Sequence, residues 1–108
     1  MIDRIKKIIN RSEVSEKAIE AYLVSRCKEA KLACLKYSNQ GVIGYPDRLV
    51  LLPKGKVVWV ELKSKGAHAS AIQIIRHRQL KELGHQVRII DSRLGVDLLM
   101  FDIANGNI

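Results

Sequence analysis

The chain has 108 residues, of which 47% are hydrophobic and 28% charged, a balance typical of one folded domain rather than of a disordered chain or of two separate cores. Its 19 lysines and arginines outnumber 11 acidic residues and give a net charge of +8, which favours a phosphate-rich partner. No stretch is apolar enough for a membrane span or a signal peptide, so we expect one cytoplasmic domain over residues 1–108 that binds no membrane.

The first residues predict a short amphipathic helix, because Ile2, Ile5, Ile8 and Ile9 recur at helical spacing. A helix of this length is marginal alone. Residues 1–11 should therefore pack against something, either the rest of the domain or a second copy of the chain in a dimer.

A second helix is predicted from about Glu13 to Ala30, with Ser12 or Ser15 as its N-cap. Its apolar stripe consists of Ile19, Leu23, Cys27 and Ala30. At about 100° per residue, Glu16 falls in the middle of that stripe and Glu20 about 40° to one side. The helical phase favours Glu16 as an inward-facing carboxylate, with Glu20 as the alternative. A solvated carboxylate at the helix N-terminus explains Glu13 well and Glu16 less well.

Four strands and two further helices follow. The strands are predicted at 32–38, 48–52, 56–62 and 85–91, and the helices at 70–83 and 96–103. A Pro-Lys-Gly turn makes the second and third strands a hairpin, and Ser70 with Gln73 matches a capping box. The helix at 70–83 is predicted to turn inward Ile72, Ile75, Leu80 and Leu83. The order α α β β β α β α contains a βαβ crossover and predicts an α/β fold, a mixed sheet flanked by helices.

Two charged residues close the most apolar strand. Glu61 and Lys63 share one face of it, while Asp47 opens the neighbouring strand directly after Pro46. These could be an exposed ion pair and a turn residue, but a buried carboxylate without a role is uncommon. Asp47, Glu61 and the carbonyl of Leu62 form an oxygen-donor set suited to Mg²⁺. Lys63 could then orient a water or balance charge on a phosphorane, and Glu16 could add a carboxylate on the metal or through its water.

These residues carry a resemblance to a known family. Pro46-Asp47 followed by Glu61-Leu62-Lys63 resembles the PD-(D/E)xK nuclease signature. The ordered segments Gly44–Arg48, Val60–Lys63, Ser70–Gln73 and Leu80–Gly84 resemble the VRR-NUC (virus-type replication-repair nuclease) family over about residues 13–92. The resemblance implies a restriction-endonuclease-like core and a Mg²⁺-dependent DNA endonuclease, with Mn²⁺ able to substitute, in which in-line attack by water leaves 5′-phosphate ends.

The same resemblance implies residue roles. Asp47 and Glu61 match the metal ligands, Lys63 the catalytic lysine and Glu16 the helix carboxylate. Gln73 matches a glutamine near the active site, although it could serve only as a cap for its own helix. Stand-alone members resemble Holliday-junction resolvases, which implies a homodimer that cuts branched DNA, and a phage protein of this kind would act in the host cytoplasm.

The remaining polar residues give weaker indications. Lys65, Arg76 and Arg78 are candidate phosphate contacts, although solvated charges would have the same pattern. Tyr45 and His77 depart from the family pattern and are expected not to touch the metal site. Two other functions stay open: a non-catalytic nucleic-acid-binding protein on the same fold, and a sequence-specific restriction-type endonuclease.

Overall fold

A β-hairpin lies at the centre of the computed structural model, which describes residues 15–108. Its strands are β2 (Arg48–Leu51) and β3 (Val57–Leu62), joined by the short 3₁₀ turn η1 (Pro53–Gly55). The outer strands are β1 (Ala33–Lys36) and β4 (Gln86–Ile90), and the helices are α2 (Glu16–Glu29), α3 (Ala71–Glu82) and α4 (Arg93–Ala104). The helix predicted at residues 2–9, and its suggested dimer contact, lie outside the described residues.

The four strands form one mixed sheet in the order β1-β2-β3-β4. The first two pairings are antiparallel and the pairing of β3 with β4 is parallel, which confirms the predicted hairpin and crossover. In the hairpin, Arg48 pairs with Val60 and Leu49 with Trp59. This register sets which side chains share a face at the end of the sheet where β2 begins and β3 ends.

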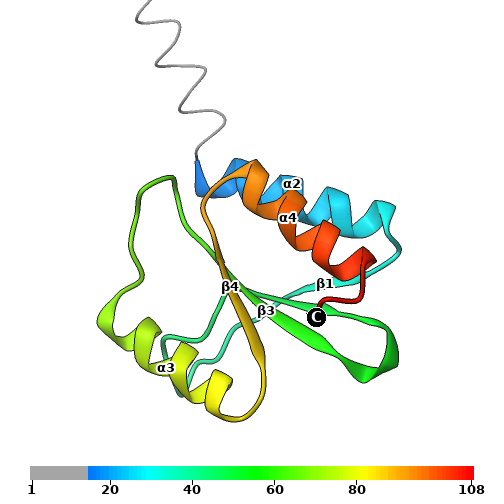
Figure 1. Cartoon of the computed structure of the whole chain (residues 1–108). Coiled ribbons are helices and arrows are strands. Elements are labelled where there is room, and N and C mark those ends of the chain that lie inside the picture. The colour runs from blue at the N-terminus through cyan, green and yellow to red at the C-terminus, as the bar shows by residue number, and fades with distance from the viewer. Residues whose placement is uncertain (1–14) are drawn as a thin grey trace, which may run out of the picture.

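Helices α2 and α4 cover the same face of the sheet, and α3 lies apart from them (Figure 1). The buried core joins the two helices to the hairpin and β4; it consists of Ile19, Leu23, Cys27, Val50, Val58, Val60, Leu62, Ile90, Val96, Leu99 and Met100. Val58, Val60 and Leu62 alternate with Trp59 and Glu61, so the latter two point to the opposite face, the side on which α3 lies.

Polar caps explain where the helices begin. Ser15 Oγ accepts a hydrogen bond from the amide of Ala18 (3.1 Å) and starts α2. The capping box at α3 is present, with Gln73 N donating to Ser70 Oγ (3.3 Å) and Ser70 N donating to Gln73 Oε1 (2.8 Å). The last helix starts at Arg93, three residues before the predicted Val96, because Ser92 caps it through the amide of Gly95 (3.0 Å).

The predicted inward faces of two helices need correction. On α3, Ile75 is exposed and Leu83 is 78% exposed, whereas His77 and Leu80 are buried. Gln73, His77 and Leu80 follow the i, i+4, i+7 spacing of one helical face, so the helix is turned away from the predicted stripe. On α2, Ala30 is exposed because it is the C-cap rather than part of the core.

None of the helices within residues 15–108 is long and apolar enough to cross a membrane.

The core predicts a clear difference between two leucines. Leu23→Ala removes a fully buried side chain, so the free energy of unfolding should fall by about 2–5 kcal/mol. Leu98→Ala shortens an exposed side chain on α4 and should change the free energy of unfolding by less than about 0.5 kcal/mol. Chemical denaturation of both variants measures this, and equal losses would contradict the assignment of the core.

Candidate active site

The hairpin brings two carboxylates opposite each other at the end of the sheet. Asp47 directly precedes β2 and Glu61 lies near the end of β3. Since Arg48 pairs with Val60, extending the antiparallel register by one residue sets Asp47 across from Glu61. Asp47 Oδ2 accepts a hydrogen bond from the backbone amide of Leu62 (3.0 Å), and the buried Pro46 precedes it. The carboxylate of Asp47 is therefore fixed against the strand that carries Glu61.

Glu61 is a deeply buried carboxylate with unequal surroundings for its two oxygens. Its side chain is only 1% exposed. Oε1 accepts a hydrogen bond from Gln73 Nε2 and lies 3.7 Å from Lys63 Nζ. Oε2 is buried and has no hydrogen-bond partner within residues 15–108. A buried oxygen without a partner costs free energy, and a cation would satisfy it.

Burial sets the protonation of this site. Removal from water, together with the neighbouring charge of Asp47, raises the pKa of Glu61 to about 7, and Lys63 opposes the shift. Glu61 therefore titrates near neutral pH when no cation is bound. The carboxylates are held close enough to repel each other, as expected where a divalent ion belongs between them.

Gln73 joins α3 to this site by using both ends of its amide. Its Oε1 accepts from the backbone amide of Ser70 (2.8 Å), which caps the helix, while its Nε2 donates to Glu61. The cap and the contact with the site are thus compatible rather than alternatives. The contact also explains why α3 turns the Gln73–His77 face toward the sheet.

The helix carboxylates behave differently from each other. Glu16 and Glu20 both line, with Asp47, a cavity of about 240 Å³ at the start of α2. Glu20 accepts from Arg48 Nε (3.1 Å) and is held by that ion pair. Glu16 is exposed and so does not face inward as helical phase predicts; it lies in the first turn, before Ile19, the first core residue of the helix.

The donor set suits a cation that keeps water ligands. No cluster of three or more acidic, histidine or cysteine side chains close enough to hold a metal occurs in residues 15–108. Two carboxylates, Asp47 and Glu61, are nevertheless sufficient protein ligands for Mg²⁺, which usually completes its shell with water and phosphate. The partnerless Oε2 of Glu61 fits this chemistry.

The predicted phosphate contacts are spread over different surroundings. Lys65 is exposed on the loop after β3, and Arg78 is exposed on α3. Arg76 donates from Nε to the carbonyl of Ile43 (2.9 Å) and from Nη1 to Gln79 Oε1 (3.1 Å). Arg76 therefore serves the structure of a loop, whereas Lys65 and Arg78 form no side-chain hydrogen bond or ion pair with residues 15–108.

Sequence reasoning missed several residues near the site. Lys36 and Tyr37 line the cavity with Asp47, and Tyr37 N donates to the carbonyl of Asp47 (2.8 Å). His77 is buried, and its pKa is lowered by burial and by the charges of Lys81 and Lys63. His77 makes no hydrogen bond to Asp47 or Glu61, so the expectation that it does not touch the metal site stays a prediction. The alternation of β1 could have indicated Tyr37 only if its register with β2 were known.

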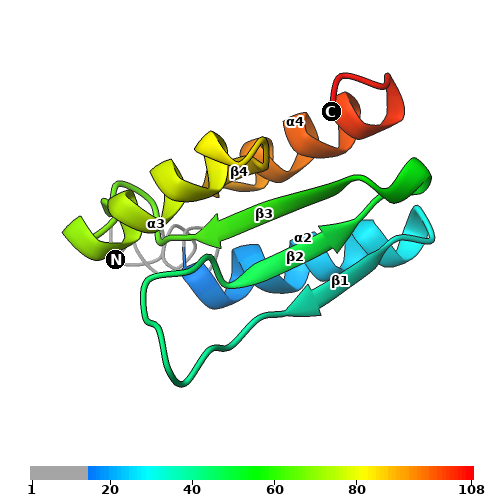
Figure 2. The same cartoon turned by 90° about the horizontal axis from the view of Figure 1, so that it is seen from below.

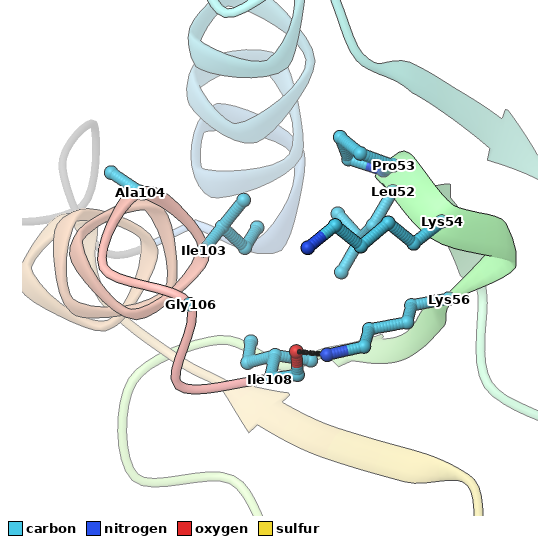
Figure 3. A pocket seen from close by; sticks show the side chains of 8 residues that line it. All are labelled: Leu52, Pro53, Lys54, Lys56, Ile103, Ala104, Gly106 and Ile108. Carbon is cyan, nitrogen blue, oxygen red and sulfur yellow. Dashed lines mark hydrogen bonds between the residues drawn. The ribbon is translucent and has the colours of Figure 1, made fainter.

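A second cavity marks the other end of the hairpin. It encloses about 210 Å³ between the η1 turn and the end of α4, and the side chains of Lys54 and Lys56 border it (Figure 3). Lys56 Nζ donates to the carbonyl oxygen of Ile108 (2.9 Å). The cavity contains no carboxylate side chain and lies at the end of the hairpin opposite Asp47 and Glu61.

The raised pKa of Glu61 predicts a pH-dependent effect of Glu61→Gln without metal. The folded-state pKa of about 7 exceeds the ordinary 4.5, so ionisation of Glu61 destabilises the fold as pH rises between these values. Below that range both proteins carry a neutral group; above it the variant should be more stable by up to a few kcal/mol. Denaturation in EDTA across this pH range measures the difference in free energy of unfolding between wild-type protein and Glu61→Gln. Glu82→Gln, on the exposed face of α3, is the control. A difference that does not change with pH would contradict the prediction.

Comparisons with known proteins bear on the family of this chain. No model of a known protein family matches the chain. A curated relative, "Putative nuclease p44" of Acyrthosiphon pisum secondary endosymbiont phage 1, is 40% identical over 80 residues, which are 74% of this chain and 86% of the relative. A solved structure described as a VRR_NUC domain has a TM-score of 0.74 and 29% identity, over 79% of this chain and 92% of that one. Likeness in sequence to the phage protein and in fold to the VRR_NUC domain shows that this chain belongs to the VRR-NUC family.

Proposed function

We propose that this chain is a Mg²⁺-dependent endonuclease that hydrolyses phosphodiester bonds in branched DNA. The observation that carries the proposal is the buried carboxylate of Glu61, set opposite Asp47 and beside Lys63, with one oxygen lacking any partner within residues 15–108. Such a group is costly in a structural strand and useful in a metal site. Membership of the VRR-NUC family and the likeness to a phage protein named as a nuclease support the same reaction.

Asp47 and Glu61 are the proposed metal ligands. The backbone carbonyl of Leu62 is a further candidate, and Glu16, on the wall of the cavity it shares with Asp47, would act through a bound water. A bound Mg²⁺ would supply Lewis-acid polarisation of the phosphate and a lower pKa for the attacking water.

The other side chains orient and balance charge. Lys63 Nζ, beside Glu61, is positioned to hold the attacking water by a hydrogen bond and to offset negative charge on the phosphorane. Gln73 fixes the orientation of the Glu61 carboxylate through Oε1 and so leaves Oε2 free for a ligand. In hydrolysis the water oxygen bonds to phosphorus and the bond to the 3′ oxygen breaks, which leaves a 5′ phosphate.

The net charge of +8 supports DNA as the partner, with Lys65 and Arg78 as its phosphate contacts. We propose a homodimer as the active form, because two copies of a small site could cut the two strands at a branch point. Specificity would follow from DNA shape rather than base sequence. A phage relative is compatible with action on DNA in the host cytoplasm.

Cleavage assays test the reaction. Wild-type protein should cut a labelled four-way junction with Mg²⁺ or Mn²⁺ and not with EDTA. Lys63→Ala should lower the cleavage rate by at least about 100-fold, the usual size of such an electrostatic contribution. Lys28→Ala removes the same charge from the exposed last turn of α2 and should cut within about threefold of wild type.

Three results would contradict the proposal. Equal cutting by Lys63→Ala would refute the role of that lysine. Binding of the junction without any metal-dependent cutting would indicate a non-catalytic binding protein. Cutting of plain duplex at a fixed sequence would indicate a restriction-type enzyme.

Metal binding can be measured without cleavage. Mg²⁺ or Mn²⁺ should raise the melting temperature of wild-type protein, because a ligand that binds only the folded state stabilises it. Asp47→Asn should remove most of this shift. Asp91→Asn, on the loop after β4, should retain it, and a shift of equal size in both variants would contradict ligation by Asp47.

A further inference from the structure

The loop between β1 and β2 (residues 37–47) carries an unexplained apolar tip. Ile43 is 69% exposed and its neighbour Val42 is also exposed. The loop projects past the arrowheads of β1 and β3, at the end of the sheet where Glu61 lies (Figure 2). Val42 and Ile43 thus lie on the loop that leads directly to Asp47.

Hydrogen bonds hold this tip in one conformation. Asn39 Oδ1 accepts from the amides of Gly41 (2.9 Å) and Val42 (3.0 Å), and Asn39 Nδ2 donates to the hydroxyl of Tyr37 (3.2 Å). A side-chain oxygen that bonds amides two and three residues ahead replaces the backbone contacts of a turn. The apolar residues are thus presented by an ordered turn.

Helix α3 fixes the other side of the loop. Arg76 Nε donates to the carbonyl of Ile43 (2.9 Å), and its guanidinium lies over the ring of Tyr45 at 5.8 Å. Gly44 has a φ of +97°, and a Cβ there would lie 2.9 Å from Arg76 Cγ and 3.0 Å from the carbonyl oxygen of Ile72. Only glycine permits this close approach, so the sequence at the tip is suited to tight docking on α3.

The loop ends at Asp47, the proposed metal ligand. Tyr37 N donates to the carbonyl of Asp47 (2.8 Å), and Tyr37, Tyr45 and Trp59 pack their rings together at 5.0–6.0 Å. These contacts therefore tie the two ends of the loop to each other and to β3. A contact made by Ile43 would set where the phosphate backbone lies relative to the site.

We propose that Val42 and Ile43 form a wedge that inserts into the branch point of the DNA substrate and packs against an unstacked base. This rests on the proposed function, because it assumes a branched DNA substrate. Aliphatic side chains inserted between base steps are a known way for proteins to kink and unstack DNA, and unstacking costs least where pairing is already interrupted. The wedge would give the small site its preference for branches without reading base sequence.

Fluorescence of 2-aminopurine placed at the branch of a four-way junction tests the wedge. Binding is measured in the Lys63→Ala background so that the DNA stays intact. The branch signal should rise on binding, and Val42→Ser with Ile43→Ser should abolish the rise and weaken junction binding by about tenfold. Phe101→Ser, at a residue 61% exposed on α4, on the face of the sheet opposite α3, is the matched control and should leave the rise unchanged.

A second variant moves the wedge without changing its apolar side chains. Gly44→Ala should displace the tip from α3 and reduce the branch signal, while the melting shift with Mg²⁺ confirms an intact metal site. Wild-type signal in both the serine double variant and Gly44→Ala would overturn the wedge. A changed elution volume of the serine variant with an unchanged signal would also overturn it and indicate a contact between protein copies.

The wedge and the proposed function fail in different ways. In one outcome, the serine double variant, otherwise wild type, cuts junctions with metal and prefers them over duplex as strongly as wild-type protein does. That result would contradict the wedge and support the nuclease. If 2-aminopurine fluorescence at the branch depends on Ile43 but the protein never cuts DNA, the catalytic proposal is contradicted and the wedge is supported.

Discussion

Burial of the Glu61 carboxylate is the constraint on which the rest of the site depends. The strand that carries it is otherwise apolar, and its side chain is almost inaccessible to water. An isolated charge in this position would be expelled or neutralised. Gln73, Lys63 and Asp47 surround it; they lie on α3, directly after β3 and directly before β2. The placement of these elements relative to one another therefore offsets the cost of burying the Glu61 carboxylate.

Gln73 shows how local and tertiary requirements are met by one side chain. As the third residue of α3 it completes the capping box, a local requirement, and its amide nitrogen contacts Glu61, a tertiary one. The rotation of α3 follows from this double use. His77 becomes buried, while the more apolar Ile75 and Leu83 remain exposed. The contact between Gln73 and Glu61 therefore overrides the hydrophobic pattern of the helix.

Most of the fold was predictable because its signals are local. Alternation in β3, the Pro-Lys-Gly turn and the Ser70 cap each depend on neighbouring residues, and the crossover to β4 follows from chain order. The start of α4 was missed because its cap, Ser92, stands four residues before Val96, where the apolar stripe begins. The inward direction of Glu16 was mispredicted because helical phase gives a direction but not whether another element covers that turn.

The sequence by itself determined that Asp47, Glu61 and Lys63 belong together, since strand parity and the hairpin put acidic and basic groups at one end of an apolar pair of strands. Only the tertiary structure decided that Arg48 holds Glu20 and that the tip at Ile43 is tied to Arg76. These contacts join residues 28 and 33 positions apart. Their geometry depends on how layers pack, which no local pattern specifies.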